Sequence, residues 1–300
     1  MLNLLTGSSY KFYAVQAKVL HQVCKYNVVD ITDNHFHLDP NGQKEEAVKS
    51  FLKAGGTRLV LVHKPYSPWK KIEEFKKQVQ TTLKLSDKAR ETGAKVAVIS
   101  SPHPVQLVKL LEYYSPEEAS EIYLDAVDFC TTLVNERVTV GLGELGRPHF
   151  EVDQKTWDLC NQILKESLKR AKEVDASVIL HTETGTPEVM ADLASISNKA
   201  NFPKSRLVKH YGGIGSIENS HGITVSLLAS NENIAFASKN NVSHMLETDY
   251  LDDPKRPGAV LGPKTVPRKS LKSLQEGVIN EEQFSKIHTD IPNFIYKEFI

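Results

Sequence analysis

The sequence predicts an α/β fold, specifically a single-domain (β/α)8 TIM barrel, from three observations. Short apolar runs alternate with longer amphipathic stretches along the 300-residue chain. The apolar runs are rich in Val, Ile and Leu, as in parallel strands that are buried on both faces. The number of strand-plus-helix units is about eight, which favours a closed barrel. An open doubly wound sheet remains the alternative, because a strand count from one sequence is uncertain by about one or two.

The candidate strands span residues 28–31, 58–63, 95–100, 138–144, 177–181, 206–210, 223–227 and 243–249. Helical spacing of apolar residues occupies 45–54, 70–92, 116–136 and 153–173. The third of these begins with Ser115-Pro116-Glu117-Glu118, a typical helix start. We predict residues 1–28 to be a helical extension, with an oligomer contact as the alternative, and residues 29–300 to be the barrel.

The composition is that of an ordinary globular protein, with 40% hydrophobic residues and 37 basic against 37 acidic side chains. This balance argues against binding of duplex nucleic acid by bulk charge. The three cysteines, Cys24, Cys130 and Cys160, are odd in number and widely spaced, as expected for reduced thiols. No run of about 18 apolar residues is present, so we expect no membrane span. We therefore predict a cytoplasmic protein.

The ends of the predicted strands carry polar residues that are typical of a metal site. In a barrel, catalytic residues lie at the carboxyl ends of the strands. Strand alternation places His35 and His37 on the same side. Other candidate strands end in histidine or a carboxylate at Glu144, His181, His210 and Asp249. Each residue alone is weak support, but imidazoles and carboxylates at one mouth suit Zn²⁺, and also Mn²⁺ or Fe.

This ordered set resembles the TatD-type branch of the amidohydrolase superfamily over residues 29–300. The matching segments are His35-Phe36-His37-Leu38-Asp39, Gly143-Glu144-Leu145-Gly146, His181, His210 and Glu247-Thr248-Asp249. Residues 101–104 are similar to the family's third-strand segment, and residues 287–293 to the stretch before its last helix.

The resemblance implies a binuclear site and a division of labour within it. His35, His37 and Asp249 would hold one divalent ion, and His181 and His210 the second. Glu144 would bridge the two, and Asp249 would act as the general base. Zn is the favoured metal, with Mn, Mg or Fe as alternatives. Glu144 and Asp249 are thus the predicted catalytic residues.

The sequence departs from the family's nuclease pattern in two strands and in one loop. After Gly146 the family's Leu-Asp is replaced by Arg147-Pro148, so we expect Arg147 to add a positive charge near the metals. The family's His-x-Arg on strand five is replaced by His181-Thr182-Glu183, and we expect Glu183 to repel a phosphodiester. A long, mixed-charge loop follows Asp249 and is either a surface turn or a lid.

We expect substrate to be contacted by side chains from the loops around this mouth. The candidate substrate-binding residues are His63, His103, Arg147, Glu183 and Lys264. Strand alternation should turn Lys209 away from the mouth.

The favoured function is metal-dependent hydrolysis of a phosphoester by a deoxyribonuclease-like enzyme. A small-molecule phosphoester is one substrate class, and nucleic acid is another. The alternatives are a lactone, ester or amide hydrolase of the same superfamily and a non-enzymatic metal-binding barrel. The sequence assigns no oligomeric state.

Overall fold

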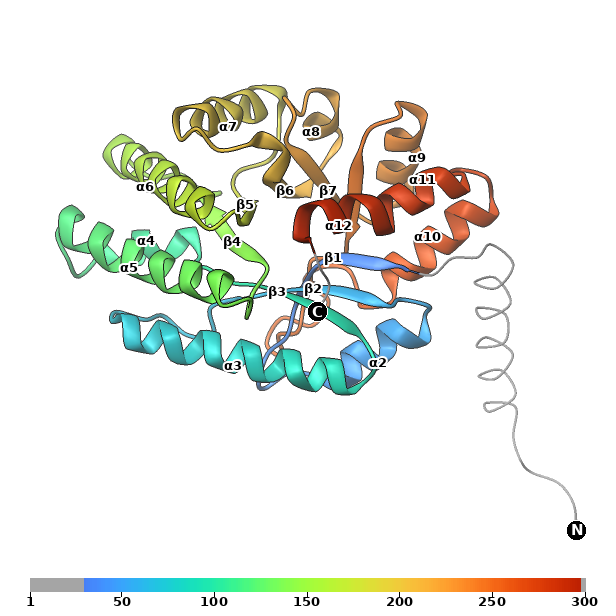
Figure 1. The fold of residues 1–300 in the computed structure, drawn as a ribbon, viewed down its shortest axis with the longest axis horizontal. Helices are drawn as coiled ribbons and strands as arrows, with labels where there is room; N and C mark the ends of the chain where they lie inside the picture. Colours follow the sequence, from blue (N-terminus) through green and yellow to red (C-terminus); the bar gives the residue numbers. More distant parts are fainter. Residues whose placement is uncertain (1–29, 298–300) are drawn as a thin grey trace, which may run out of the picture.

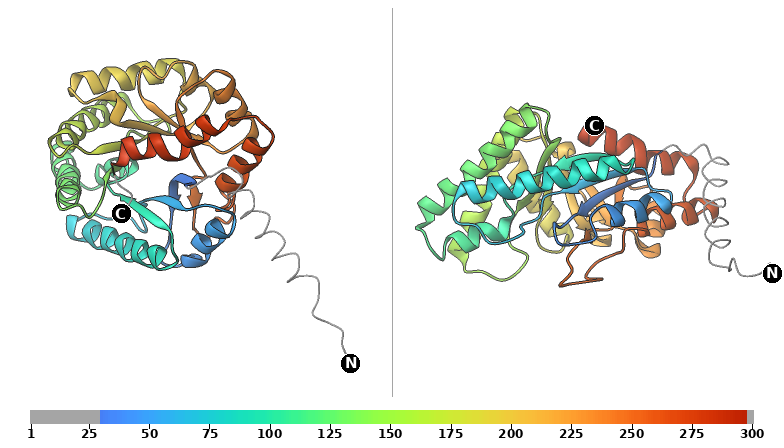
Figure 2. Two further views of the ribbon diagram at one scale, coloured as in Figure 1. Left: turned by 45° about the vertical axis from the view of Figure 1, so that its right-hand side comes forward. Right: turned by 90° about the horizontal axis from the view of Figure 1, so that it is seen from below.

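The computed structural model describes residues 30–297 as a barrel of parallel strands inside a ring of helices (Figures 1 and 2). The strands form one sheet in the order β8-β7-β6-β5-β4-β3-β2-β1-β9. They are β1 (Thr32–His37), β2 (Arg58–Val62), β3 (Lys95–Ile99), β4 (Gly141–Gly146), β5 (Ser177–His181), β6 (Leu207–Gly212), β7 (Thr224–Leu228), β8 (His244–Glu247) and β9 (Tyr250–Leu251). Strand β9 continues the direction of β8 and pairs with β1, which closes the circle. The predicted single-domain TIM barrel is confirmed.

Helices connect the strands on the outside of the barrel. The helices are α2 (Glu45–Lys53), α3 (Ile72–Glu91), α4 (Pro104–Leu110), α5 (Pro116–Asn135), α6 (Gln154–Glu173), α7 (Pro187–Lys199), α8 (Ile214–Glu218), α9 (Asn231–Lys239), α10 (Thr265–Gln275), α11 (Glu281–Ser285) and α12 (Ile291–Tyr296). Helix α5 begins where the sequence predicts: the Ser115 hydroxyl accepts from the backbone N–H of Glu118, and the Glu118 carboxylate accepts in return. This capping box satisfies two N–H groups that the helix leaves free. No helix within residues 30–297 is long and apolar enough to cross a membrane.

Two apolar layers hold the barrel together. The larger layer lies between the strands and the surrounding helices. The smaller one fills the barrel interior, with Val60, Ile179 and Val208 from three strands. Tyr296 of α12 joins this interior layer, and its hydroxyl donates to Asn34 at 2.5 Å. Helix α12 therefore closes the amino-terminal end of the barrel and leaves the carboxyl end for the site.

The position predicted for the first strand was wrong. We expected residues 28–31, but β1 runs from Thr32 to His37 and so contains the histidines instead of preceding them. Its polar residues are compatible with a buried strand because the backbone pairs with β2 and β9 on either side. Of the run that suggested the strand, residues 28 and 29 lie outside the described residues, and residues 30 and 31 precede β1. The helix predicted for residues 1–28 lies outside the described residues.

Candidate metal centre at the carboxyl end of the barrel

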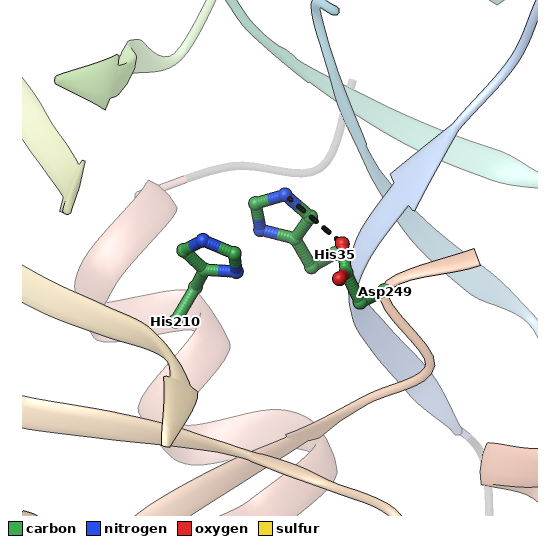
Figure 3. Close-up of side chains that lie close together, drawn as sticks. All are labelled: His35, His210 and Asp249. Carbon is green, nitrogen blue, oxygen red and sulfur yellow. Dashed lines mark ion pairs between the residues drawn. The ribbon is translucent and has the colours of Figure 1, made fainter. Parts of the chain in front are cut away.

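All six predicted metal ligands come together at the carboxyl end of the barrel. Four strands and one connection supply them: His35 and His37 lie on β1, Glu144 on β4, His181 on β5, His210 on β6, and Asp249 between β8 and β9. Figure 3 shows two imidazoles and the Asp249 carboxylate facing the same space. Gly146 allows β4 and β5 to approach closely here, because a Cβ on it would lie 1.9 Å from the carbonyl oxygen of His181.

The two histidines of β1 direct their Nε2 atoms at the same point. The Nε2 atoms of His35 and His37 are 3.1 Å apart, and His37 Nε2 is 3.5 Å from Asp249 Oδ1. His37 Nδ1 donates to the carbonyl of Val62 at 2.8 Å. Since Nδ1 therefore carries the proton in a neutral ring, the lone pair of His37 lies on Nε2. A backbone carbonyl that fixes this tautomer is common behind a metal-binding histidine.

Glu144 stands between this pair and a second pair of imidazoles. Its Oε1 is 2.8 Å from His181 Nδ1, 3.0 Å from His210 Nε2 and 3.7 Å from His35 Nε2. The rings of His35 and His210 stack at 4.2 Å between centroids. The side chain of Glu144 is 5% exposed. Its buried Oε1 therefore lies near imidazole nitrogens of both pairs of histidines.

A buried carboxylate fixes the connection that carries Asp249. Asp33 accepts from the backbone N–H of Thr248 at 2.9 Å and from its hydroxyl at 2.7 Å. Asp249 follows directly with φ 50°, a left-handed conformation that Asp adopts more readily than most residues. Its side chain is 16% exposed, whereas that of Glu144 is 5% exposed.

The donor set fits divalent metal ions. Among residues 30–297, three groups have ligand atoms within 4.8 Å of one another: His35, His210 and Asp249; His35, His37 and Glu144; and His103, Glu144 and His181. Imidazole nitrogens that approach one another at 3.1 Å are stabilised when a proton or a cation lies between them. Nitrogen and carboxylate donors are those that Zn²⁺ and its neighbours prefer.

The protonation of these groups agrees with cation binding. Burial raises the pKa of Glu144, but His181 and His210 outweigh burial and hold it well below its usual value. Burial lowers the pKa of His210, but the hydrogen bond and charge of Glu144 outweigh burial and raise it to about 10. Burial and the neighbouring His210 hold the pKa of His35 well below its usual value. A divalent cation would take the place of the proton on His210.

A cavity of about 390 Å³ opens above these donors. His103 lines it, with Nε2 3.9 Å from Glu144 Oε2. Lys64, Lys109 and Arg256 give its wall a basic character, and Arg256 comes from the long loop after β9 that projects from the barrel (Figure 2).

Two of the predicted substrate contacts lie away from this cavity. His63 is 2% exposed, and its Nδ1 is 2.8 Å from the Thr82 hydroxyl. Its ring packs edge-on against Phe75. Lys264 is exposed at the start of α10. Neither side chain lines the space above the ligands.

The expectations for Arg147 and Glu183 require correction, because the two side chains bind each other. Arg147 Nε and Nη2 donate to the two carboxylate oxygens of Glu183 at 2.9 and 2.5 Å. Arg147 Nη1 also donates to Asp192 and Asn161, and the guanidinium stacks on Trp157 at 4.5 Å. The guanidinium therefore offers no free charge to the metal ligands, and Glu183 is neutralised. The two departures from the family pattern compensate each other.

One side chain near the site was missed in the sequence, and for a second only the direction was predicted. His149 was not considered, yet its Nδ1 lies 2.8 Å from His181 Nε2. Its position three residues after Gly146, at the end of a candidate catalytic strand, was the available signal. Lys209 was expected to point away from the mouth, yet it lines a second cavity beside the first.

The model of the family "TatD related DNase" matches residues 32–297. The chain belongs to this family. An uncharacterized protein of Methanocaldococcus jannaschii is 33% identical over 89% of this chain and 95% of its own length. A TatD-like protein from Archaeoglobus fulgidus has a similar structure, with TM-score 0.60 and 17% identity over 88% of this chain and 99% of its own. The TatD homolog YJJV of Escherichia coli has TM-score 0.60 and 18% identity, over 89% and 98%.

Family membership and the donor set together make the chain a metal-dependent hydrolase. The two solved structures share its fold. The recognition of a TatD-type protein from the ordered histidines and carboxylates is confirmed.

Proposed function

We propose that this TatD-family chain hydrolyses a phosphoester of a nucleotide or nucleic acid at a binuclear metal site, with zinc as the favoured ion. The observation that carries the proposal is the position of Glu144 Oε1, which faces His181 and His210 on one side and His35 on the other. The family name, TatD related DNase, supports the same substrate class.

The chain offers two sets of ligands around that shared carboxylate. His35, His37 and Asp249 would hold one ion, and His181 and His210 the other, with Glu144 common to both. Divalent ions in these positions would lower the pKa of a bound water and polarise the phosphoryl group.

Asp249 is the residue placed to accept the proton of the attacking water. Both carboxylates line the cavity, but that of Asp249 is the more exposed, at 16% against 5% for Glu144, which lies close to two imidazoles. The hydrogen bonds from Thr248 to Asp33 fix the backbone directly before Asp249 and so orient the base. A positioned general base contributes about 10²–10⁴-fold to a rate.

The charges around the cavity favour an anionic substrate over a neutral lactone or amide. Lys64, Lys109 and Arg256 line its wall. Lys64 is paired with Asp39 at 2.5 Å and Arg256 with Asp253 at 2.9 Å, whereas Lys109 has no ion pair among the described residues. Because Arg147 neutralises Glu183, that carboxylate does not oppose a phosphodiester.

The test combines metal analysis with a substrate panel. Protein reconstituted with Zn²⁺ or Mn²⁺ is analysed for bound metal and assayed on bis-p-nitrophenyl phosphate, single-stranded DNA and lactones. We expect about two equivalents of metal and turnover of the phosphoesters. Glu144→Gln should lose metal and more than about 100-fold in activity, since it removes a shared ligand. Glu173→Gln, the same change at an exposed carboxylate on α6, should behave as wild type.

Several results would contradict the proposal. One equivalent of metal in an active enzyme would remove the bridging role of Glu144. Turnover of lactones alone would show that the substrate is a carbon ester and not a phosphoester. Tight metal binding without turnover of any member of the panel would favour a binding protein.

A further inference from the structure

Lys209 carries a buried positive charge beside the metal centre. The residue is 1% exposed. Its Nζ donates to the carbonyl oxygen of His210 at 2.7 Å, and within residues 30–297 it forms no ion pair. Burying an ammonium group without a counter-ion costs several kcal/mol. Because the buried group does not stabilise the fold, its position at the edge of a cavity indicates a role in binding a ligand.

Lys209 leaves its strand on the side that alternation predicts, and the length of its side chain brings it to a second cavity. Val208 and His210 face the barrel interior and the site, so Lys209 leaves β6 on the outer side, toward the helices. Its stem then runs past Gly185: a Cβ built there would contact Lys209 Cε at 3.7 Å and would overlap Ser216 Oγ at 1.9 Å. The absence of a side chain at Gly185 keeps this space open.

The stem ends at a second cavity of about 350 Å³. This cavity shares His149, His181, His210 and Asp249 with the one above the metal ligands, so the two meet at the metal centre. Lys209, Thr184 and Tyr211 belong to the second cavity, and Tyr211 is 51% exposed at its rim.

Two carboxylates share this cavity, and neither forms an ion pair with Lys209: Asp249 is a candidate metal ligand, and Glu183 is bound by Arg147. Both oxygens of Glu183 accept hydrogen bonds from Arg147. The cavity therefore contains a buried cation that forms no ion pair among the described residues, next to a centre that fits a phosphoester.

We propose that Lys209 binds a second phosphate of the substrate, the one next to the phosphate that is cleaved at the metal centre. The inference rests on the proposed function and narrows its substrate class to nucleotides or nucleic acids with at least two phosphates. A hydrogen bond from an ammonium to an anion is worth about 1.5–3 kcal/mol, which corresponds to about 10- to 150-fold in affinity.

The experiment compares two ligands that differ by this phosphate. Binding of thymidine 5′-monophosphate and thymidine 3′,5′-bisphosphate to the metal-loaded protein is measured by calorimetry. We expect wild type to prefer the bisphosphate by at least about tenfold. Lys209→Met should bind both ligands alike, with the monophosphate affinity unchanged. Lys199→Met, which removes an exposed lysine of α7, should keep the preference.

A stability measurement separates binding from a structural role. Replacement of an unpaired buried charge by an apolar side chain of similar length is often neutral or stabilising. We therefore expect the Tm of metal-loaded Lys209→Met to equal or exceed that of wild type. Lys209→Gln serves as the second variant if Lys209→Met does not fold.

The inference and the proposed function fail in different ways. Wild type without a preference, or a Lys209 variant that keeps it, overturns the inference even if phosphoesters are hydrolysed. Absence of hydrolysis overturns the proposed function, and the two binding constants still decide the role of Lys209.

Discussion

Replacement of Arg147 by Met tests whether its ion pair with Glu183 stabilises the loops around the site. Arg147 is 1% exposed, and its guanidinium binds Glu183, Asp192 and Asn161. Removing one partner of a fully buried pair costs about 3–5 kcal/mol. The side chains of Glu183 and Asp192 are 26% and 50% exposed, so water can replace part of the lost interaction. We expect Arg147→Met to lower the free energy of unfolding by about 2–3 kcal/mol.

The assay is a double-mutant cycle in which the free energy of unfolding of each variant is measured by urea denaturation. Arg147→Met combined with Glu183→Gln removes the carboxylate that the first change leaves unpaired, so the two changes should couple by about 1–2 kcal/mol. Lys88→Met with Glu91→Gln is the matched control, because that pair on α3 is 55% and 62% exposed. We expect less than about 0.5 kcal/mol there. Equal coupling in both cycles would refute the view that Arg147 and Glu183 stabilise each other.

Two further predictions concern histidines. His149→Leu removes the hydrogen-bond acceptor 2.8 Å from His181 Nε2. In a chelator titration this change should weaken metal binding by about 10- to 100-fold. His149→Asn keeps an acceptor there and should restore most of the metal affinity. Unchanged affinity in His149→Leu would contradict a positioning role; Phe150→Ala is the control. Burial lowers the pKa of His288 from 6.5 to about 3. Below pH 6.5 the unfolded chain therefore binds more protons than the folded protein. The free energy of unfolding then decreases as the pH is lowered, by about 1.4 kcal/mol per pH unit for this group. In urea denaturation from pH 5 to 6.5, His288→Gln should flatten that slope; an unchanged slope would exclude His288 as its source.

The sequence predicted the strands that are apolar and missed the start of the strand that is polar. Strand β5 lies at the residues expected, because Ser177–His181 contains three successive apolar residues, two of them β-branched, before one histidine. Strand β1 was placed too early, since Thr32–His37 contains five polar residues that pattern alone assigns to a loop. Its strand character comes from pairing with β2 and β9, and the partner in β9 is more than two hundred residues away.

The convergence of the candidate metal ligands was predictable because strand ends meet at one mouth in a barrel, whereas the surrounding side chains depend on packing. Alternation gave the direction in which Lys209 leaves β6 but not the place where its long stem ends. Arg147 and Glu183 each departed from the family pattern, and only their distance shows that each compensates for the other. His149 was missed because the fold, and not the spacing along the chain, brings its Nδ1 to 2.8 Å from His181 Nε2.

Strand β1 has a consequence for synthesis of the chain on the ribosome. It pairs with β2 soon after it is made, but its other edge waits for Tyr250 and Leu251 of β9. The amino-terminal end of the barrel waits longer, until Tyr296 reaches Asn34. An open edge recruits other strands. During translation, the two candidate metal-binding histidines of β1 therefore lie on an unprotected edge. The nascent barrel becomes safe from intermolecular pairing only when nearly all of its residues have left the exit tunnel.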